Sequence, residues 1–179
     1  MPESADGEEV LFVGNRYDPN VRGIQAFLKH AWPRIRQAQP QARLRVCGNV
    51  GQALPHPPEG VDILGPVENL DECYKRASIV IVPVDYGSGL KIKTVEALAH
   101  GKCVVTTPEG VRGMGSTETL PLIIMPASSD MAEPIMDLLG HPEKRRGHEE
   151  KAFRHAQEFL APSVVYQALG EVLRSPSEE

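Results

Sequence analysis

Short runs of β-branched and aliphatic residues alternate along this sequence with stretches whose apolar residues recur at helical spacing. Such alternation predicts parallel strands joined by right-handed helical crossovers, because each crossover helix packs back onto the sheet. The expected fold class is therefore α/β, a parallel sheet flanked by helices. Strands are expected at residues 10–13, 44–47, 61–64, 79–84, 103–106 and 122–125. Helices are expected from residue 21 onward and at 70–77, 91–100, 129–139, 142–160 and 162–173.

Several positions refine this pattern. The run at 79–84 is almost entirely apolar, which indicates a central strand buried on both faces of the sheet. Pro33 is expected to kink or restart the first helix, and Gly101 is expected to end the helix at 91–100. The Gly- and Pro-rich stretch 49–60 predicts an irregular loop.

Length and composition describe an ordinary globular chain. A length of 179 residues fits one domain with a single core. Charged residues make up 24% and hydrophobic residues 41%, which argues against disorder or a fibrous repeat. No apolar run approaches the roughly 20 residues of a spanning helix, and the acidic start MPESADGEEV differs from a signal peptide. A cytoplasmic protein is expected.

Net charge and cysteine usage exclude two further classes of function. The formal net charge of -5 argues against a nucleic-acid partner, since phosphate backbones are bound by clustered Lys and Arg. Cys47, Cys73 and Cys103 are odd in number, lack metal-ligand spacing and lie in or beside apolar runs. We expect reduced, buried thiols, with no disulfide and no zinc.

Two loops stand at positions where an open α/β sheet binds its ligands, the carboxyl ends of strands. The first is VGNRYDPN, in which Gly14 lets the backbone approach a ligand and Asn15, Arg16 and Asn20 offer hydrogen-bond donors. The second is GSGLKIK at 87–93, with two glycines, a hydroxyl and two lysines at the start of a helix. A helix N-terminus with these groups suits a diphosphate.

Neither loop matches the common phosphate-binding fingerprints, because GxGxxG and GxxxxGK[ST] are both absent. The absence of these motifs argues against a dehydrogenase and against a kinase. A GSG loop before a helix is also compatible with a simple tight turn. The residues by themselves thus leave two alternatives, an anion-binding site and a turn.

Longer segments resemble a known family, the retaining glycosyltransferases of family 4, in the C-terminal domain called glycosyl transferase group 1. The resemblance covers residues 10–160 and includes LFVGNRYDPNVRGIQAFLKHAWPRI, LRVCGN and VDILGPVENLDECYKRASIVIVPV. The most specific segment is GSGLKIKTVEALAHGKCVVTTPEGVRG, which is similar to the donor-site segment of that family. It implies a Rossmann-like, nucleotide-sugar-binding half of a two-domain GT-B enzyme that needs no metal and no cofactor beyond its donor.

The resemblance assigns Glu96 to the second glutamate of the family's paired motif, which accepts hydrogen bonds from the donor ribose. A carboxylate suits this task because it can accept two charge-assisted bonds, and an exposed helix glutamate is the alternative. Ser88 stands where the first glutamate is usual, so here the sequence departs from the family. Backbone N-H groups of Ser88, Gly89 and Leu90 are expected to replace part of that contact.

Lysines of the second loop are the expected partners of the diphosphate. Lys93 is the first choice and Lys91 the second, because a cation there stabilises charge on the leaving group. A solvated charge at the helix start is the alternative for either one. The family's usual cations near the first strand fall at Asn15 and Asn20, and Arg16 is the candidate to substitute for them. Lys93 and Glu96 are the candidate catalytic residues.

The resemblance also implies a division of the chain. Residues 1–9 form an acidic linker or leader, 10–160 the Rossmann-like domain, and 161–179 a C-terminal helix and tail that packs on a separate N-terminal domain. The segment 65–68, and Val67 in it, resembles the part that surrounds the base.

The implied function is transfer of a sugar from a UDP or GDP sugar to a carbohydrate or lipid-linked acceptor in polysaccharide biosynthesis. The isolated domain is expected to be inactive, and the N-terminal domain could bring it to the inner face of the membrane. Two alternatives stay open, a non-catalytic nucleotide-sugar-binding module and a sugar-nucleotide epimerase of similar fold.

Overall fold

Six strands form one sheet in which every neighbouring pair is parallel. The computed structural model describes residues 7–88 and 91–160. The strands are β1 (Glu9–Val13), β2 (Arg43–Cys47), β3 (Val61–Gly65), β4 (Ile79–Val82), β5 (Cys103–Thr106) and β6 (Ile123–Ile124). Their order across the sheet is β3-β2-β1-β4-β5-β6. This confirms the predicted α/β class, and the order is that of the doubly wound dinucleotide-binding folds.

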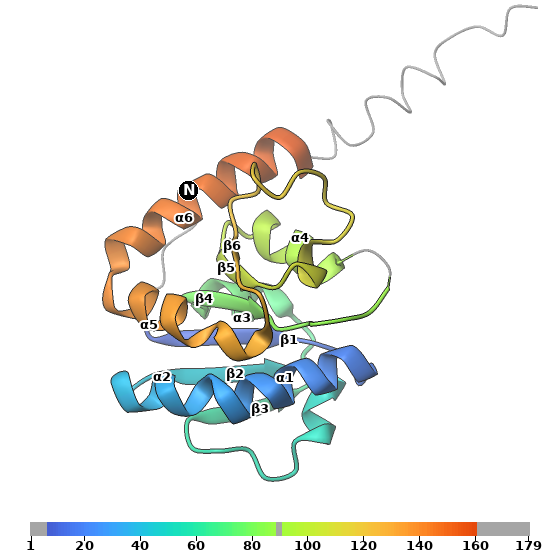
Figure 1. The fold of residues 1–179 in the computed structure, drawn as a ribbon, viewed down its shortest axis with the longest axis vertical. Helices are drawn as coiled ribbons and strands as arrows, with labels where there is room; N and C mark the ends of the chain where they lie inside the picture. The colour runs from blue at the N-terminus through green and yellow to red at the C-terminus, as the bar shows by residue number, and fades with distance from the viewer. Residues whose placement is uncertain (1–6, 89–90, 161–179) are drawn as a thin grey trace, which may run out of the picture.

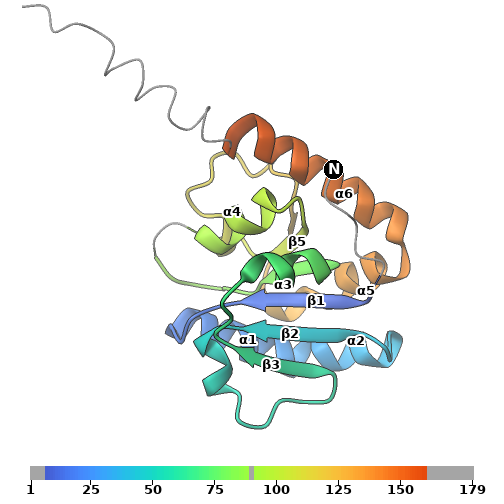
Figure 2. The ribbon, with the colours of Figure 1, turned by 180° about the vertical axis from the view of Figure 1, so that it is seen from behind.

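Helices cover both faces of the sheet (Figures 1 and 2). They are α1 (Asp18–His30), α2 (Trp32–Ala38), α3 (Leu70–Arg76), α4 (Ile92–Ala99), α5 (Ala132–Gly140) and α6 (Pro142–His155). The helices α1, α2 and α5 pack on one face, and α3 and α4 pack on the other. The long helix α6 contacts α4, α5 and β5. None of the helices in the described part of the chain is long and apolar enough to span a bilayer.

Alternation along the strands divides the core into two clusters. Val10 and Phe12 of β1 face the layer of α1 and α2, while Leu11 faces the opposite layer. In β4, whose side chains alternate between the same two clusters, all four residues are buried, as the apolar run at 79–84 predicts. A strand covered by helices on both faces has no solvent side, so β4 confirms the expected central position.

Element boundaries follow the predictions closely, with local exceptions. The first helix begins at Asp18 rather than residue 21, because Pro19 in its first turn is preorganised for a helix start. It ends at His30, and α2 begins at Trp32 with Pro33 in its first turn, which confirms the predicted restart. The helix expected at 162–173 lies outside the described residues.

Three further boundaries differ from the sequence-based expectation. The loop 49–60 opens with a 3-10 helix, Asn49–Ala53. A second 3-10 turn, Ser128–Asp130, precedes α5, which therefore begins at residue 132 rather than 129. The last strand has only two residues, Ile123–Ile124. Gly101 has φ of 63° and its N-H donates to the Leu98 carbonyl, so it ends α4 as predicted.

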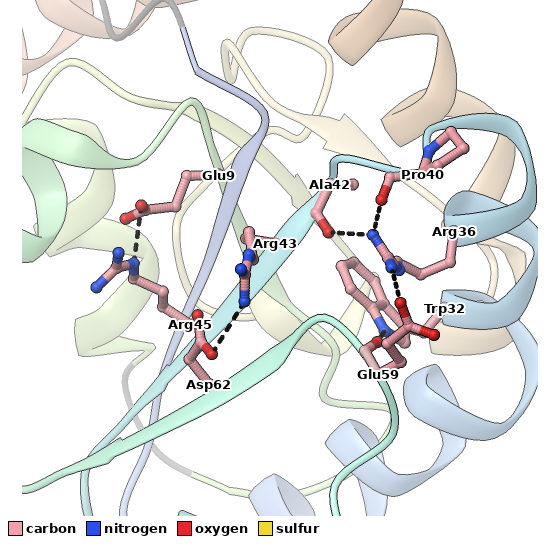
Figure 3. Close-up of polar contacts among 9 residues, drawn as sticks. All are labelled: Glu9, Trp32, Arg36, Pro40, Ala42, Arg43, Arg45, Glu59 and Asp62. Carbon is pink, nitrogen blue, oxygen red and sulfur yellow. Dashed lines mark hydrogen bonds and ion pairs between the residues drawn. The ribbon is translucent and has the colours of Figure 1, made fainter.

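Polar side chains secure the edge of the sheet that carries the long loop before β3 (Figure 3). Arg36 Nη2 of α2 lies 2.8 Å from the side-chain oxygen Glu59 Oε1. The Trp32 indole N-H donates to the backbone carbonyl of Glu59 at 3.0 Å. On the opposite side of β2, Arg45 pairs with Glu9 at 2.7 Å. The two contacts to Glu59 hold the end of this otherwise irregular loop against α2, at the amino end of β3.

The three cysteines are free thiols. Cys47 and Cys103 are buried and Cys73 is half-buried. Burial raises the pKa of Cys47 and of Cys103 to about 12. The Sγ atoms of Cys47 and Cys73 lie 3.5 Å apart, between the end of β2 and α3.

Candidate functional site

A cavity of about 460 Å³ opens at the carboxyl ends of β1, β2 and β4. In Figure 2 the arrowheads of β1 and β2 point to this edge. Chain connections leave β1 and β4 in opposite directions across the sheet, so the crevice between them is the topological switch point of the fold. The cavity is lined by Val13, Gly14, Asn15, Tyr17, Pro19, Asn20, Gly48, Asn49, Pro66, Val67, Leu70, Val82, Val84, Tyr86, Gly87, Ser88, Lys91, Ile92, Lys93 and Glu96.

Backbone groups form the floor of the cavity where β1 and β2 end. The Gly14 N-H donates to the Cys47 carbonyl at 2.9 Å, and the Gly48 N-H donates to the Gly65 carbonyl at 2.7 Å. Gly48 has φ of 94°, and a Cβ at this position would lie 2.2 Å from the Gly14 oxygen. Only glycine fits here, because any side chain would push the two loops apart.

Lys93 is held at the cavity by two asparagines of the first loop. Its Nζ donates to Asn20 Oδ1, and Asn20 Nδ2 donates to Asn15 Oδ1 at 2.6 Å and to the Asn15 carbonyl at 3.1 Å. The ammonium also lies 5.6 Å from the ring centroid of Phe12. Burial, with a smaller contribution from neighbouring Lys91, lowers the pKa of Lys93 to about 8. The cation is therefore fixed in place while its charge is only weakly compensated.

Lys91 is placed differently. Its Nζ lies 2.7 Å from Glu109 Oε1, and Arg112 lies 2.7 Å from Glu109 Oε2. Lys91 and Glu109 are both almost fully buried, whereas Arg112 is exposed. The alternative of a solvated charge at the helix start is therefore wrong for Lys91, because its charge is buried and balanced by a carboxylate.

Glu96 faces the same cavity one helical turn after Lys93. Its Oε2 accepts a hydrogen bond from the Tyr74 hydroxyl at 3.4 Å. The Tyr74 ring stacks on His100 with centroids 4.3 Å apart and an interplanar angle of 12°. Residues three apart on a helix share a face, so α4 presents one cation and one carboxylate to the cavity.

Most of the predicted site residues come together here. Those that line the cavity are Gly14, Asn15, Asn20, Val67, Ser88, Lys91, Lys93 and Glu96. Gly89 and Leu90 lie outside the described residues. Arg16 is exposed and is not among the described residues of the lining, so the expectation that it replaces the missing cations is not supported. The bond between Asn15 and Asn20 closes the first loop without it.

Sequence reasoning missed several residues of the site. Tyr17 and Tyr86 are exposed rings of the lining, and the Tyr86 hydroxyl donates to Asp18. Tyr74 and Glu109 act from behind the lining, on Glu96 and Lys91. No spacing in the sequence links these pairs, since each partner comes from a different element. In the residues that the structure describes, no group of three His, Cys, Asp or Glu side chains could hold a metal ion.

Comparison with known proteins identifies relatives of this chain. The sequence model of the family described as "Glycosyl transferases group 1" matches residues 7–141. An uncharacterised 44.6 kDa protein in the cps region of Klebsiella pneumoniae is 25% identical over 156 residues, covering 80% of this chain and 39% of that protein. An exopolysaccharide phosphotransferase of Streptomyces coelicolor is 30% identical over 115 residues, covering 61% of this chain and 12% of that protein. The chain thus spans well under half the length of these relatives.

Solved structures share the fold at low sequence identity. Staphylococcus aureus TarM, as a mutant in complex with UDP and other ligands, matches with a TM-score of 0.76 at 14% identity, over 98% of this chain and 37% of that chain. Anabaena HepE in complex with UDP and glucose matches with a TM-score of 0.75 at 16% identity, over 95% of this chain and 49% of that chain. The C-terminal domain of the group 1 glycosyl transferase LpcC from Francisella tularensis matches with a TM-score of 0.70 at 15% identity. The match covers 88% of this chain and 89% of that chain.

Proposed function

Because the chain belongs to the glycosyl transferases group 1 family, we propose that it is the donor-binding half of a retaining glycosyltransferase. The donor is a nucleoside-diphosphate sugar, and the acceptor is a carbohydrate or a lipid-linked carbohydrate. Polysaccharide biosynthesis is the proposed setting, in line with the cps region and the exopolysaccharide named for the two relatives. The crystal complexes of TarM and HepE with UDP support a nucleotide as the ligand.

One observation carries this proposal, namely that Lys93 and Glu96 face a single cavity at the switch point of the sheet. A nucleoside diphosphate places its ribose directly beside its phosphates, so one ligand needs both a cation and a carboxylate close together. In the proposed complex Lys93 and the start of α4 contact the diphosphate, and Glu96 accepts hydrogen bonds from the ribose hydroxyls. Pro66 and Val67 contact the base.

The chemistry proposed for this half is electrostatic. Negative charge develops on the diphosphate as the bond to the sugar breaks, and a preorganised cation stabilises that charge more than it stabilises the bound donor. Lys93 suits this role because Asn20 fixes its ammonium at the cavity. Lys91 contributes less, since Glu109 balances its charge.

The acceptor site is proposed to lie on a separate N-terminal domain. This chain spans 39% of the Klebsiella relative, whereas it spans 89% of the excised C-terminal domain from Francisella. We accordingly propose that residues 10–160 form the donor domain, with 1–9 as a linker and 161–179 as a segment that packs on the N-terminal domain. Transfer is expected only when both domains are present.

Calorimetric titration with UDP and GDP tests the binding part of the proposal. The wild-type chain should bind one of them, and Lys93→Met and Glu96→Gln should each weaken that binding by about tenfold or more, as expected for losing a charged contact. Lys29→Met is the matched control, because Lys29 is an exposed residue near the end of α1, outside the cavity. Equal affinities for wild type and Lys93→Met would disprove the diphosphate assignment.

A turnover assay separates transfer from its alternatives. The chain is combined with its N-terminal domain and a labelled UDP or GDP sugar, with and without candidate acceptors. Glycosylated acceptor supports the proposal, and isomerised donor without acceptor indicates an epimerase. Binding without any turnover across donors and acceptors indicates a non-catalytic module.

A further inference from the structure

Tyr74 is a fully buried tyrosine whose hydroxyl reaches the edge of the cavity. Its side chain is 1% exposed, and its hydroxyl donates to Glu96 Oε2 at 3.4 Å. It belongs to α3, whereas Glu96 belongs to α4, so this bond joins two separate elements beside the cavity. A buried hydroxyl needs a polar partner, and the carboxylate of Glu96 supplies it.

The ring of Tyr74 is held in place by contacts other than the bond to Glu96. It belongs to the buried cluster that includes Leu11, Val80 and Ala97, and it stacks on His100 at 4.3 Å. His100 Nε2 in turn lies 3.5 Å from Asp71 Oδ1 on the same helix as Tyr74. The position of the hydroxyl is therefore set by packing that does not depend on Glu96.

This geometry determines what the Glu96 carboxylate can offer a ligand. The bond from Tyr74 uses one acceptor site of Oε2, so Oε1 and the remaining site of Oε2 can accept hydrogen bonds from the two ribose hydroxyls. Burial, together with the nearby charge of Glu96, raises the pKa of Tyr74 above its usual value. The hydroxyl thus keeps its proton across the physiological range and stays a donor, which holds the carboxylate in one rotamer.

We propose that Tyr74 is a positioning residue for the donor ribose, which acts by orienting the carboxylate of Glu96 toward the cavity. The inference rests on the proposed function and adds to it a residue that does not line the cavity. A preorganised carboxylate binds two hydroxyls more tightly than a mobile one, because less rotamer freedom is lost on binding.

The test is Tyr74→Phe, which removes the hydroxyl and keeps the stacked ring. Calorimetry would compare UDP with 2′,3′-dideoxy-UDP, or GDP with its dideoxy form if wild type binds GDP more tightly. We expect Tyr74→Phe to weaken binding of the ribonucleotide by about threefold to tenfold, because the carboxylate, no longer held by Tyr74, must lose rotamer freedom on binding. Binding of the dideoxy nucleotide should change by less than about twofold, since it has no hydroxyl for Glu96 to accept from.

A merely structural role for Tyr74 predicts a different result, because a general loosening of the cavity weakens both nucleotides equally. Equal losses, or no loss at all, would overturn the inference. A double-mutant cycle with Glu96→Ala, which removes the acceptor of the Tyr74 hydroxyl, adds a second test, in which the effect of Tyr74→Phe on ribonucleotide binding should largely disappear. Additive effects in that cycle would also overturn the inference.

The wild-type titrations distinguish failure of this inference from failure of the proposed function. If wild type binds neither ribonucleotide, or binds the ribo and dideoxy forms equally, the ribose contact of Glu96 itself is wrong. If wild type prefers the ribonucleotide and Tyr74→Phe keeps that preference in full, Glu96 keeps its assignment and only the role of Tyr74 is wrong.

Discussion

Two lysines two residues apart take different roles because their nearest partners differ. Lys91 lies against Glu109, with which it forms a buried ion pair. Lys93 contacts only the neutral amide oxygen of Asn20 and the face of Phe12 among the polar and aromatic contacts described for its ammonium. A half-buried ammonium that contacts no carboxylate keeps its charge at a cost, which an incoming phosphate can offset. In the proposed complex, Lys93 is therefore the lysine that gains most from a diphosphate.

The pKa of Lys93 makes nucleotide affinity depend on pH. Below its pKa of about 8 the ammonium is charged and attracts the diphosphate, and above about 8 the free protein loses that charge. Binding of phosphate raises the pKa of Lys93, so affinity is full at neutral pH and falls as pH rises, by up to about tenfold per unit. Nucleotide phosphates are already ionised above about pH 7.

Calorimetry between about pH 7 and pH 10 checks this dependence. Lys93→Met should bind weakly with a flat profile, and the control Lys29→Met should keep the fall seen in wild type. A profile that rises with pH in wild type would contradict the assignment of Lys93 to the diphosphate.

The pair of Lys91 and Glu109 supplies a stability prediction. Glu109→Ala leaves a buried ammonium without its carboxylate, which should lower the free energy of unfolding by about 3 kcal/mol or more. Arg112→Ala removes only the exposed partner of Glu109 and should cost less than about 1 kcal/mol. Urea unfolding of both variants measures the two values, and similar costs would argue against a buried pair.

At the scale of elements, the site depends on how closely α1 approaches the end of β4. Gly23 of α1 packs against the backbone, and a Cβ there would lie 1.7 Å from the Pro83 carbonyl oxygen. Asn20 lies one turn earlier on the same helix and holds Lys93 of α4. The contact at Gly23 therefore sets the distance between the first loop and α4.

Gly23→Ala should force α1 away from β4, because the blocking atom belongs to the backbone. We expect a loss of about 1 to 3 kcal/mol in the free energy of unfolding, together with weaker nucleotide binding. The matched control is Gly147→Ala in α6, where a Cβ meets nothing within 4 Å. That change should stabilise the protein by about 0.5 to 1 kcal/mol, since alanine favours a helix over glycine. Denaturant unfolding of both variants distinguishes steric displacement of α1 from a general effect of replacing a helical glycine by alanine.

At the scale of the whole molecule, one sheet with a core on each face carries the cavity at its switch point. The cavity takes its lining from the ends of β1, β2, β3 and β4 and from the start of α4. Since those elements belong to one folded domain, a ligand in the cavity contacts structure that is lost all at once on unfolding.

Nucleotide binding should therefore stabilise the entire domain. At a nucleotide concentration about 100 times Kd, the gain should be about 2.7 kcal/mol, if the unfolded chain does not bind. Urea unfolding should stay a single transition whose midpoint rises with UDP or GDP concentration. Uridine or guanosine, which lack the diphosphate, should shift the midpoint less. A transition that splits in two would contradict the single cooperative unit.

The strand and helix pattern of this chain determined the α/β class, the central position of β4, the restart at Pro33 and the end of α4 at Gly101. These features are local, because hydrophobic periodicity, proline and glycine act within a few residues. The family segments further indicated Lys93, Glu96 and the two loops that meet at one cavity.

Only the tertiary structure decided which partner each charged group has. Glu109, Tyr74 and Asn20 reach the residues of α4 from three other elements. The tertiary structure also places Arg16 outside the lining of the cavity, and it pairs Lys91, which lies in the lining, with Glu109. The physical reason is that burial and pairing depend on groups brought together across the sheet, at separations that no sequence pattern encodes.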